Sequence, residues 1–121
     1  MNGSFGNFVV KTDQSVAEGG EGAEPSPFQL FLASLATCAG IFTLRFCQAR
    51  NLPIDQIKIK QTTDWNHEKK LVENLVIQID LPHDFPEKYV DALVRSVDQC
   101  TVKRSIANPP KMEVRTKIAS A

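Results

Sequence analysis

The sequence predicts one domain over residues 1–121 that combines a long buried helix with antiparallel strands and shorter helices. Three patterns carry this prediction. An apolar run of helical length spans residues 27–49. Two alternating runs, 57–63 and 75–81, are joined by a polar stretch, which is typical of an antiparallel hairpin. In a third run, 90–100, apolar residues recur at three- and four-residue steps, which indicates one buried helical face.

The long helix has recognisable ends. Pro25 and Pro27 open it, and proline suits a first helical turn because its missing N–H would have no partner there. Pro53 stops it, because the residue before a proline is pushed out of helical conformation. A helix that is apolar all round lies in a core or a membrane, and a membrane span needs about 20 strongly apolar residues. Three small or polar residues dilute this run, namely Ser34, Thr37 and Gly40. We therefore predict the central core helix of a soluble domain.

Two further elements are predicted before the long helix. Loose alternation favours a strand over residues 5–12. The Gly- and Glu-rich stretch 17–24 has no periodicity and predicts a surface loop.

The C-terminal part is predicted to hold more helix and a last strand. Asp84 and Glu87 match a capping box, which would open the helix on residues 90–100. One or two more helical turns are expected over 102–107. Strict alternation of apolar and charged residues over 112–118 predicts a strand.

Composition narrows the classes of partner and location. Lys and Arg number 14 and balance 14 Asp and Glu, so there is no electrostatic reason to expect nucleic acid or an anionic membrane as a partner. The first ten residues lack the pattern of a signal peptide, and the cytoplasm is the expected location. Three cysteines are too few and too widely spaced for a secreted disulfide scaffold.

Two of the cysteines are candidates for thiol chemistry. Cys38 lies in the middle of the long helix among small residues, and Cys100 ends the apolar face of the later helix. Two helices in one small core could bring these thiols together, and a close pair can cycle between dithiol, sulfenic acid and disulfide. The competing interpretation is that both are inert core residues, since buried cysteine often packs as a small hydrophobe. Cys47 is expected to face away from Cys38 and to serve packing.

Other polar residues are weaker candidates. Gln29 is expected to bond backbone at the helix start or to line a pocket. Arg45 is two helical turns beyond Cys38 on the same face, and would pair with a carboxylate across an interface or approach the thiol. The only histidines, His67 and His83, show no zinc-ligand spacing, so no metal site is expected.

Two stretches resemble the signatures of a known family. Gly19-Gly20, followed by the run from Pro25 through Pro27-Phe28-Gln29 to Thr37-Cys38, resembles the first signature of the OsmC/Ohr family, the osmotically inducible and organic hydroperoxide resistance proteins. Cys100-Thr101-Val102 resembles the second. The order of elements fits from about residue 8 to 118, and the chain is most similar to the less characterised OsmC-like branch.

The resemblance implies a fold and an activity. The fold would be α+β, with two chains intertwined in a homodimer, long buried central helices packed on curved antiparallel sheets, and sites at the dimer interface. In active members the first cysteine attacks an organic hydroperoxide and the second forms a disulfide with it. Carried over, Cys38 is peroxidatic and Cys100 resolving. A dithiol such as a lipoyl group would reduce the disulfide, and no metal, haem, flavin or other cofactor is implied.

The chain departs from the family at the activating residues. Members of the hydroperoxide resistance group use an arginine from an early strand and a glutamate just after the helix-opening proline. This chain has no arginine before Arg45, and Phe28 follows Pro27, with Gln29 next. Glu24 or Glu21 in the preceding loop could substitute for the carboxylate, and Arg45 or Arg104 for the positive charge.

Three functions therefore stay open. The first is a Cys-based thiol peroxidase that reduces organic hydroperoxides. The second is a non-catalytic dimer of the same fold that binds a small apolar or electrophilic ligand near Cys38. The third is a structural dimer with ordinary core cysteines. We rank the peroxidase first and leave open whether the chain is an enzyme.

Overall fold

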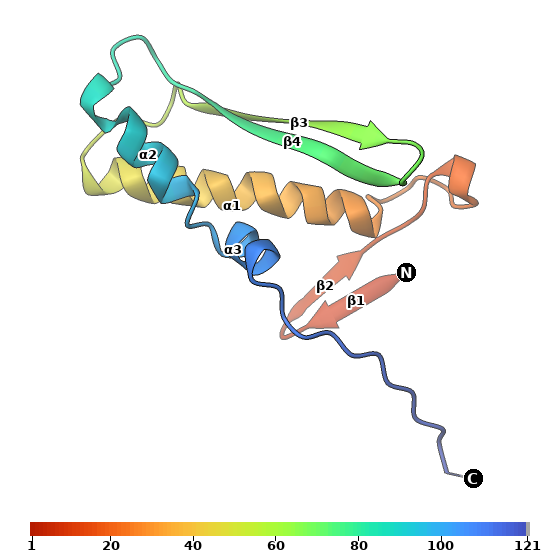
Figure 1. Cartoon of the computed structure of the whole chain (residues 1–121). Coiled ribbons are helices and arrows are strands. Elements are labelled where there is room, and N and C mark those ends of the chain that lie inside the picture. The colour runs from red at the N-terminus through yellow and green to blue at the C-terminus, as the bar shows by residue number, and fades with distance from the viewer. Residues whose placement is uncertain (121) are drawn as a thin grey trace.

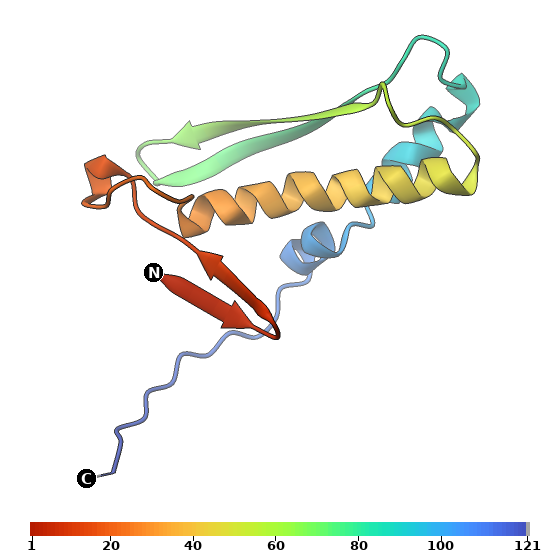
Figure 2. The same cartoon turned by 180° about the vertical axis from the view of Figure 1, so that it is seen from behind.

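The computed structural model describes residues 1–120 and shows an α+β fold arranged around one long helix. The elements in chain order are β1 (Asn2–Phe5), β2 (Phe8–Lys11), the 3-10 turn η1 (Val16–Glu18), α1 (Pro27–Ala49), β3 (Lys58–Asn66), β4 (Leu71–Asp80), the 3-10 turn η2 (Glu87–Tyr89), α2 (Val90–Val97) and α3 (Thr101–Ala107). The β3–β4 hairpin runs along one side of α1, and the β1–β2 hairpin lies on the opposite side (Figures 1 and 2). Helices α2 and α3 both pack against α1.

Helix α1 has the predicted bounds, Pro27–Ala49, because both of its ends are built into the sequence. At the start, Ser26 Oγ accepts the N–H of Gln29, and Gln29 Oε1 accepts the N–H of Ser26 at 2.8 Å. This reciprocal pair satisfies two backbone donors that the helix leaves free. At the end, Asn51 adopts a left-handed φ of 55°, and the N–H of Leu52 bonds the carbonyl of Cys47 at 2.9 Å. That closure is the usual way to satisfy the last helical carbonyls.

Helix α1 is apolar all round, but within a single chain only one of its faces is buried. Its buried residues fall on one face: Leu35, Ala39, Thr43, Phe46 and Cys47. On the opposite side Ile41 is 50% exposed, whereas Phe28, which contacts Trp65 of the hairpin, and Phe31 are 44% and 41% exposed near the start of the helix. The reason is that β3–β4 and α2 cover one face only. By length and composition α1 could also cross a membrane.

The predicted antiparallel hairpin is confirmed, with strands longer than the alternation indicated. Pairing runs from Lys58 opposite Asp80 to Asn66 opposite Leu71. Gln61 ties the hairpin to the helix, because its Nε2 donates to the carbonyl of Leu32 at 3.0 Å. The inward-facing isoleucines of the hairpin pack against the core cluster.

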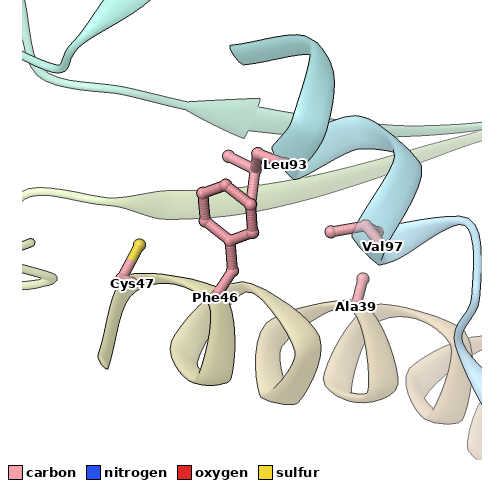
Figure 3. Packing of buried hydrophobic residues seen from close by; sticks show 5 residues of the cluster. All are labelled: Ala39, Phe46, Cys47, Leu93 and Val97. Atoms are coloured by element: carbon pink, nitrogen blue, oxygen red, sulfur yellow. The ribbon is translucent and has the colours of Figure 1, made fainter. Parts of the chain in front are cut away.

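The core lies where α1, α2 and the hairpin meet. Figure 3 shows Leu93 of α2 over the ring of Phe46, and Val97 facing Ala39. Cys47 is 0% exposed and Leu93 is 1% exposed. The apolar spacing of residues 90–100 therefore correctly predicted a helix with one buried face, although Val94 lies outside that face and is half exposed.

Two predictions about local structure are wrong, one for the segment just before α2 and one for the N-terminus. The capping box at Asp84 and Glu87 does not form, because the helical turn begins at Glu87 after Pro86 and has no side-chain cap. The single strand predicted over 5–12 is a hairpin, since Gly6 adopts a left-handed φ of 55° and turns the chain between Phe5 and Phe8.

Two predictions about the C-terminal quarter also need correction. Cys100 does not end α2 but lies in the junction between α2 and α3. The strand predicted over 112–118 is absent. This segment is extended and exposed, because no strand among residues 1–120 lies beside it to complete a ladder. The expected turns over 102–107 are confirmed as α3.

Candidate active site at the Cys38–Cys100 pair

The structure brings Cys38 and Cys100 together where α3 packs against the middle of α1. Cys38 is half-buried beside Ala39, whose small side chain allows close packing with Val97. Cys100 is 2% exposed and holds the position just before the first residue of α3. Both are free thiols. The two thiols are close enough for each to act on the pKa of the other.

The surroundings of Cys38 favour its thiolate. Burial acts to raise the pKa of Cys38, but the Cys100 thiol and the backbone N–H groups of Val102 and Thr101 donate hydrogen bonds to its sulfur. The positive charge of Arg45 adds to them, and the net result is a pKa below the ordinary cysteine value. A thiol with a lowered pKa is the better nucleophile near neutral pH because more of it is ionised.

The surroundings of Cys100 favour its protonated form. Burial raises the pKa of the Cys100 thiol most, and its hydrogen bond and proximity to Cys38 raise it further, whereas the N–H groups of Lys103 and Val102 lower it in part. Negative charge on one sulfur opposes ionisation of the other. The pair is therefore asymmetric, because Cys38 ionises more readily than Cys100.

The weaker candidates occupy different places. Arg45 is exposed, with its guanidinium carbon 5.7 Å from the centre of the Phe42 ring, and its charge reaches Cys38. Gln29 serves the cap of α1 and does not line the cavity beside the thiols. Glu24 is exposed in the loop before α1, and no hydrogen bond or ion pair holds its side chain within residues 1–120. Among the predicted site residues, Cys100 and Arg45 therefore act on Cys38, whereas Gln29 and Glu24 do not.

Cys47 belongs to the core. It lies among the buried residues of the central cluster, and burial raises the pKa of its thiol. Packing was the expected role, and the structure agrees. In the part of the chain that the structure describes, no group of three or more His, Cys, Asp or Glu residues could hold a metal ion.

An apolar cavity of about 530 Å³ reaches Cys100. It lies between α1, the hairpin and the α2–α3 segment, and Leu35, Ala39 and Cys100 form part of its wall. Cys38 itself is not part of the lining. Asp98 and Lys103 are the only charged residues in the wall, and they form an ion pair with each other. A cavity of this size and polarity suits the apolar part of a small molecule.

Sequence reasoning missed the role of Thr101 and Val102. Their N–H groups act on the Cys38 sulfur because they begin α3, where the first backbone donors of a helix have no partner within it. The signal was available, since a helical turn was expected directly after Cys100. Nothing in the spacing indicated that this turn would lie against Cys38.

Three comparisons place the chain among known proteins. The family model described as OsmC-like protein matches residues 19–115. No curated protein matches the chain in sequence. Two solved structures share the fold, at identities that support a likeness of fold alone.

The first of these structures comes from Psychrobacter arcticus 273-4 and is named for osmotic stress induction and the detoxification response. It has 22% identity and a TM-score of 0.69, covering 82% of this chain and 72% of that chain. The second, from Legionella pneumophila, is named an organic hydroperoxide resistance protein OsmC and predicted redox protein. It has 18% identity and a TM-score of 0.54, covering 84% of this chain and 75% of that chain.

Proposed function

Since the chain belongs to the OsmC-like family, we propose that it is a Cys-based thiol peroxidase that reduces organic hydroperoxides. The single observation that carries the proposal is the asymmetric thiol pair. Cys38 has a lowered pKa, and Cys100, which donates a hydrogen bond to it, has a raised one. A nucleophilic thiolate beside a protonated partner thiol is the arrangement that a two-cysteine reduction of peroxide requires.

The proposed reaction has two steps on the protein. The Cys38 thiolate attacks one peroxide oxygen, the O–O bond breaks, and an S–O bond forms. With one proton taken up, the products are the Cys38 sulfenic acid and an alcohol. Cys100 then attacks the Cys38 sulfur, an S–S bond forms, and the sulfenic oxygen leaves as water with the proton of Cys100.

Regeneration requires an external dithiol, which we propose is a lipoyl-type group. One of its thiolates attacks the Cys38–Cys100 disulfide and the second closes the dithiol to its own disulfide, which returns both cysteines to thiols. This cycle needs a compartment that keeps thiols reduced, and we propose the cytoplasm. No metal or organic cofactor takes part in either step.

The cavity supports an organic rather than an inorganic peroxide. Its wall is apolar except for the Asp98–Lys103 pair, and it reaches the site at Cys100. An alkyl or aryl group buried there contributes roughly 25 cal/mol for each Å² of apolar surface removed from water. Hydrogen peroxide has no such group, so we expect it to react more slowly.

Intact mass spectrometry without reductant tests the proposal. One equivalent of cumene hydroperoxide should convert the wild type to the Cys38–Cys100 disulfide faster than hydrogen peroxide does. Cys38→Ser should lose turnover of hydroperoxide with dithiol. Cys100→Ser should stop at a sulfenic acid on Cys38 that dimedone traps.

The matched control is Cys47→Ala, which removes a thiol from the core and should leave disulfide formation intact. Undiminished turnover in Cys38→Ser would exclude the mechanism.

The apolar cavity also favours a second candidate, a non-catalytic dimer that binds a small apolar or electrophilic ligand. In that case an apolar ligand raises the thermal midpoint of unfolding, and hydroperoxide is not turned over. Glu24 is not among the groups that act on Cys38. This is consistent with the second candidate, because no carboxylate then takes the place of the activating glutamate of the family.

We propose a homodimer as the working assembly. Exposed apolar side chains occur on α1, at Ile41, and on the C-terminal segment, where Val114 and Ile118 are each 95% exposed. Large exposed apolar surfaces mark interaction sites on proteins. A second copy would cover both regions.

A further inference from the structure

Three arginines line one surface hollow that contains neither Cys38 nor Cys100, although the charge of one of them, Arg45, also acts on Cys38. The hollow is about 520 Å³ in volume and lies between the C-terminal half of α1 and helix α2. Arg45 comes from α1, Arg50 is the capping residue directly after α1, and Arg95 comes from α2. Ser96 and Gln99 add neutral polar groups to the wall.

None of these arginines has a carboxylate partner within residues 1–120. The ion pairs in the described chain join Lys60 with Asp80, Lys103 with Asp98, and Arg115 with Glu113. Asp91 is one helical turn before Arg95 but makes no ion pair with it. Three like charges gathered without counter-ions repel one another, and an anion between them would relieve that repulsion.

Two of the guanidinium groups lie over aromatic rings: Arg45 lies 5.7 Å from the centre of the Phe42 ring, and Arg50 lies over two rings. The guanidinium carbon of Arg50 lies 3.6 Å from the centre of the Phe46 ring and 5.5 Å from that of Tyr89. Nη1 of the same arginine donates to the carbonyl of Phe46 at 3.1 Å. Stacking uses the faces of a guanidinium and leaves most of its in-plane N–H groups free to bind an oxyanion.

Helix ends account for two of the arginines, because Arg50 caps α1 and Arg95 lies in the last turn of α2. Cations near a helix C-terminus interact well with its dipole, and the Arg50 bond to the Phe46 carbonyl is of this kind. That account applies to each helix separately. It does not explain why arginines from both helices line the same hollow.

We infer that the hollow formed by Arg45, Arg50 and Arg95 binds a small dianionic molecule, through a phosphate group or paired carboxylates. Guanidinium groups bind both chemistries through two parallel hydrogen bonds, so the shared feature is the oxyanion. The inference does not depend on the proposed peroxidase, because no thiol takes part in it.

Isothermal titration of the full-length protein with inorganic phosphate and, separately, succinate tests this site. Sodium chloride holds the ionic strength constant and gives the background. Saturable binding of one anion per chain is expected. Arg95→Gln should weaken it at least about tenfold, because charge-assisted hydrogen bonds are lost.

Arg104→Gln is the matched control. Arg104 is an exposed arginine on α3 outside the hollow, and its loss should change the affinity by less than about twofold. Should Arg95→Gln fold poorly, Arg95→Lys keeps the charge but loses the planar fork, and intermediate weakening is expected. Binding of phosphate alone or succinate alone supports the site and identifies the group it recognises.

The inference is overturned by either of two results. One is the absence of saturable binding of both anions above the chloride background. The other is an equal effect of Arg95→Gln and Arg104→Gln, which would mean that the anions respond to net charge and not to the hollow.

Discussion

At the scale of single residues, the difference in pKa between the Cys38 and Cys100 thiols comes from backbone groups as much as from side chains. Cys38 receives hydrogen bonds from Cys100 and from the N–H groups of Thr101 and Val102, and the last two exist only because α3 begins there. The arginine and glutamate that the family resemblance would supply are replaced by neutral donors and the more distant charge of Arg45. Neutral donors can favour a thiolate because hydrogen bonds to the charged form lower a pKa.

This view predicts a shift in the pH dependence of Cys38 reactivity. Replacing Cys100→Ala removes one donor to the Cys38 sulfur, so the pKa of Cys38 should rise. Because alkylation requires the thiolate, the midpoint of the rate of iodoacetamide reaction at Cys38 should move to higher pH. At pH 7 the reaction should slow roughly two- to tenfold, as expected for loss of one hydrogen bond. Peptide mapping by mass spectrometry measures the rate at Cys38 alone.

Cys100→Ser is the control for that experiment. Its hydroxyl can still donate, so the midpoint should move less than in Cys100→Ala. Equal midpoints in the wild type and both variants would show that the neighbouring thiol does not act on Cys38.

At the scale of elements, the segment between β2 and α1 is organised rather than loose. The Asp13 carboxylate accepts the N–H groups of Gln14 at 2.8 Å, Glu21 at 3.2 Å and Ala23 at 3.1 Å. The bond from Ala23 lowers the pKa of Asp13 most, and burial opposes it. The carboxylate therefore stabilises the fold above its unfolded pKa, and this contribution is lost as the pH falls through the lower folded value.

Gly20 is the residue that allows this segment to close on itself. A Cβ at Gly20 would lie 2.2 Å from the Gln14 carbonyl oxygen and 2.6 Å from Asp13 Oδ1. Gly20→Ala should therefore lower the free energy of unfolding by about 1–3 kcal/mol, measured by urea denaturation. At Gly3 a Cβ meets nothing within 4 Å, so Gly3→Ala should be near neutral. Similar stability of the two variants would contradict the packing described for this loop.

The elements that the sequence predicted well are those whose ends are marked by local residues such as prolines or a polar turn. The bounds of α1 followed from Pro27 and Pro53, and the hairpin followed from alternation around a polar turn. The true capping box was also visible, since Ser26 and Gln29 have the required spacing. Asp84 and Glu87 have the same spacing, but there Pro86 leads into a 3-10 turn and no side-chain cap forms.

The parts that sequence reasoning could not locate depend on contacts between distant segments. Alternation over residues 112–118 identifies side chains suited to a strand but does not say which strand would lie beside it. The position of Cys100 near Cys38 rested on the family resemblance, whereas the donors from α3 appear only when the helices are packed. The arginine hollow likewise joins residues about fifty positions apart in sequence, which no local pattern marks.

At the scale of the whole molecule, one chain leaves apolar surface without a cover. Helix α1 is buried on one face, and the C-terminal segment is exposed throughout residues 109–120. Val114 is 95% exposed, so an aspartate there should not disturb a single folded chain. If Val114 lies in the interface between two copies, burying a carboxylate without a partner is strongly unfavourable.

Val114→Asp should therefore shift the protein from dimer to monomer, measured by light scattering after size-exclusion chromatography. Lys117→Asp places the same side chain on the opposite side of the alternation and should leave the dimer largely intact. A wild type that stays monomeric at high concentration would rule out the homodimer.

The extended C-terminal segment also bears on how long a newly made chain survives. Lys111, Arg115 and Lys117 lie on exposed backbone that has no ladder of hydrogen bonds in the described chain, and exposed backbone of this kind is a preferred site of proteolytic cleavage. A solitary copy would be trimmed there, whereas docking against another copy would shield the same peptide bonds. The abundance of the protein would then set its own lifetime, with dilute chains removed and paired chains retained.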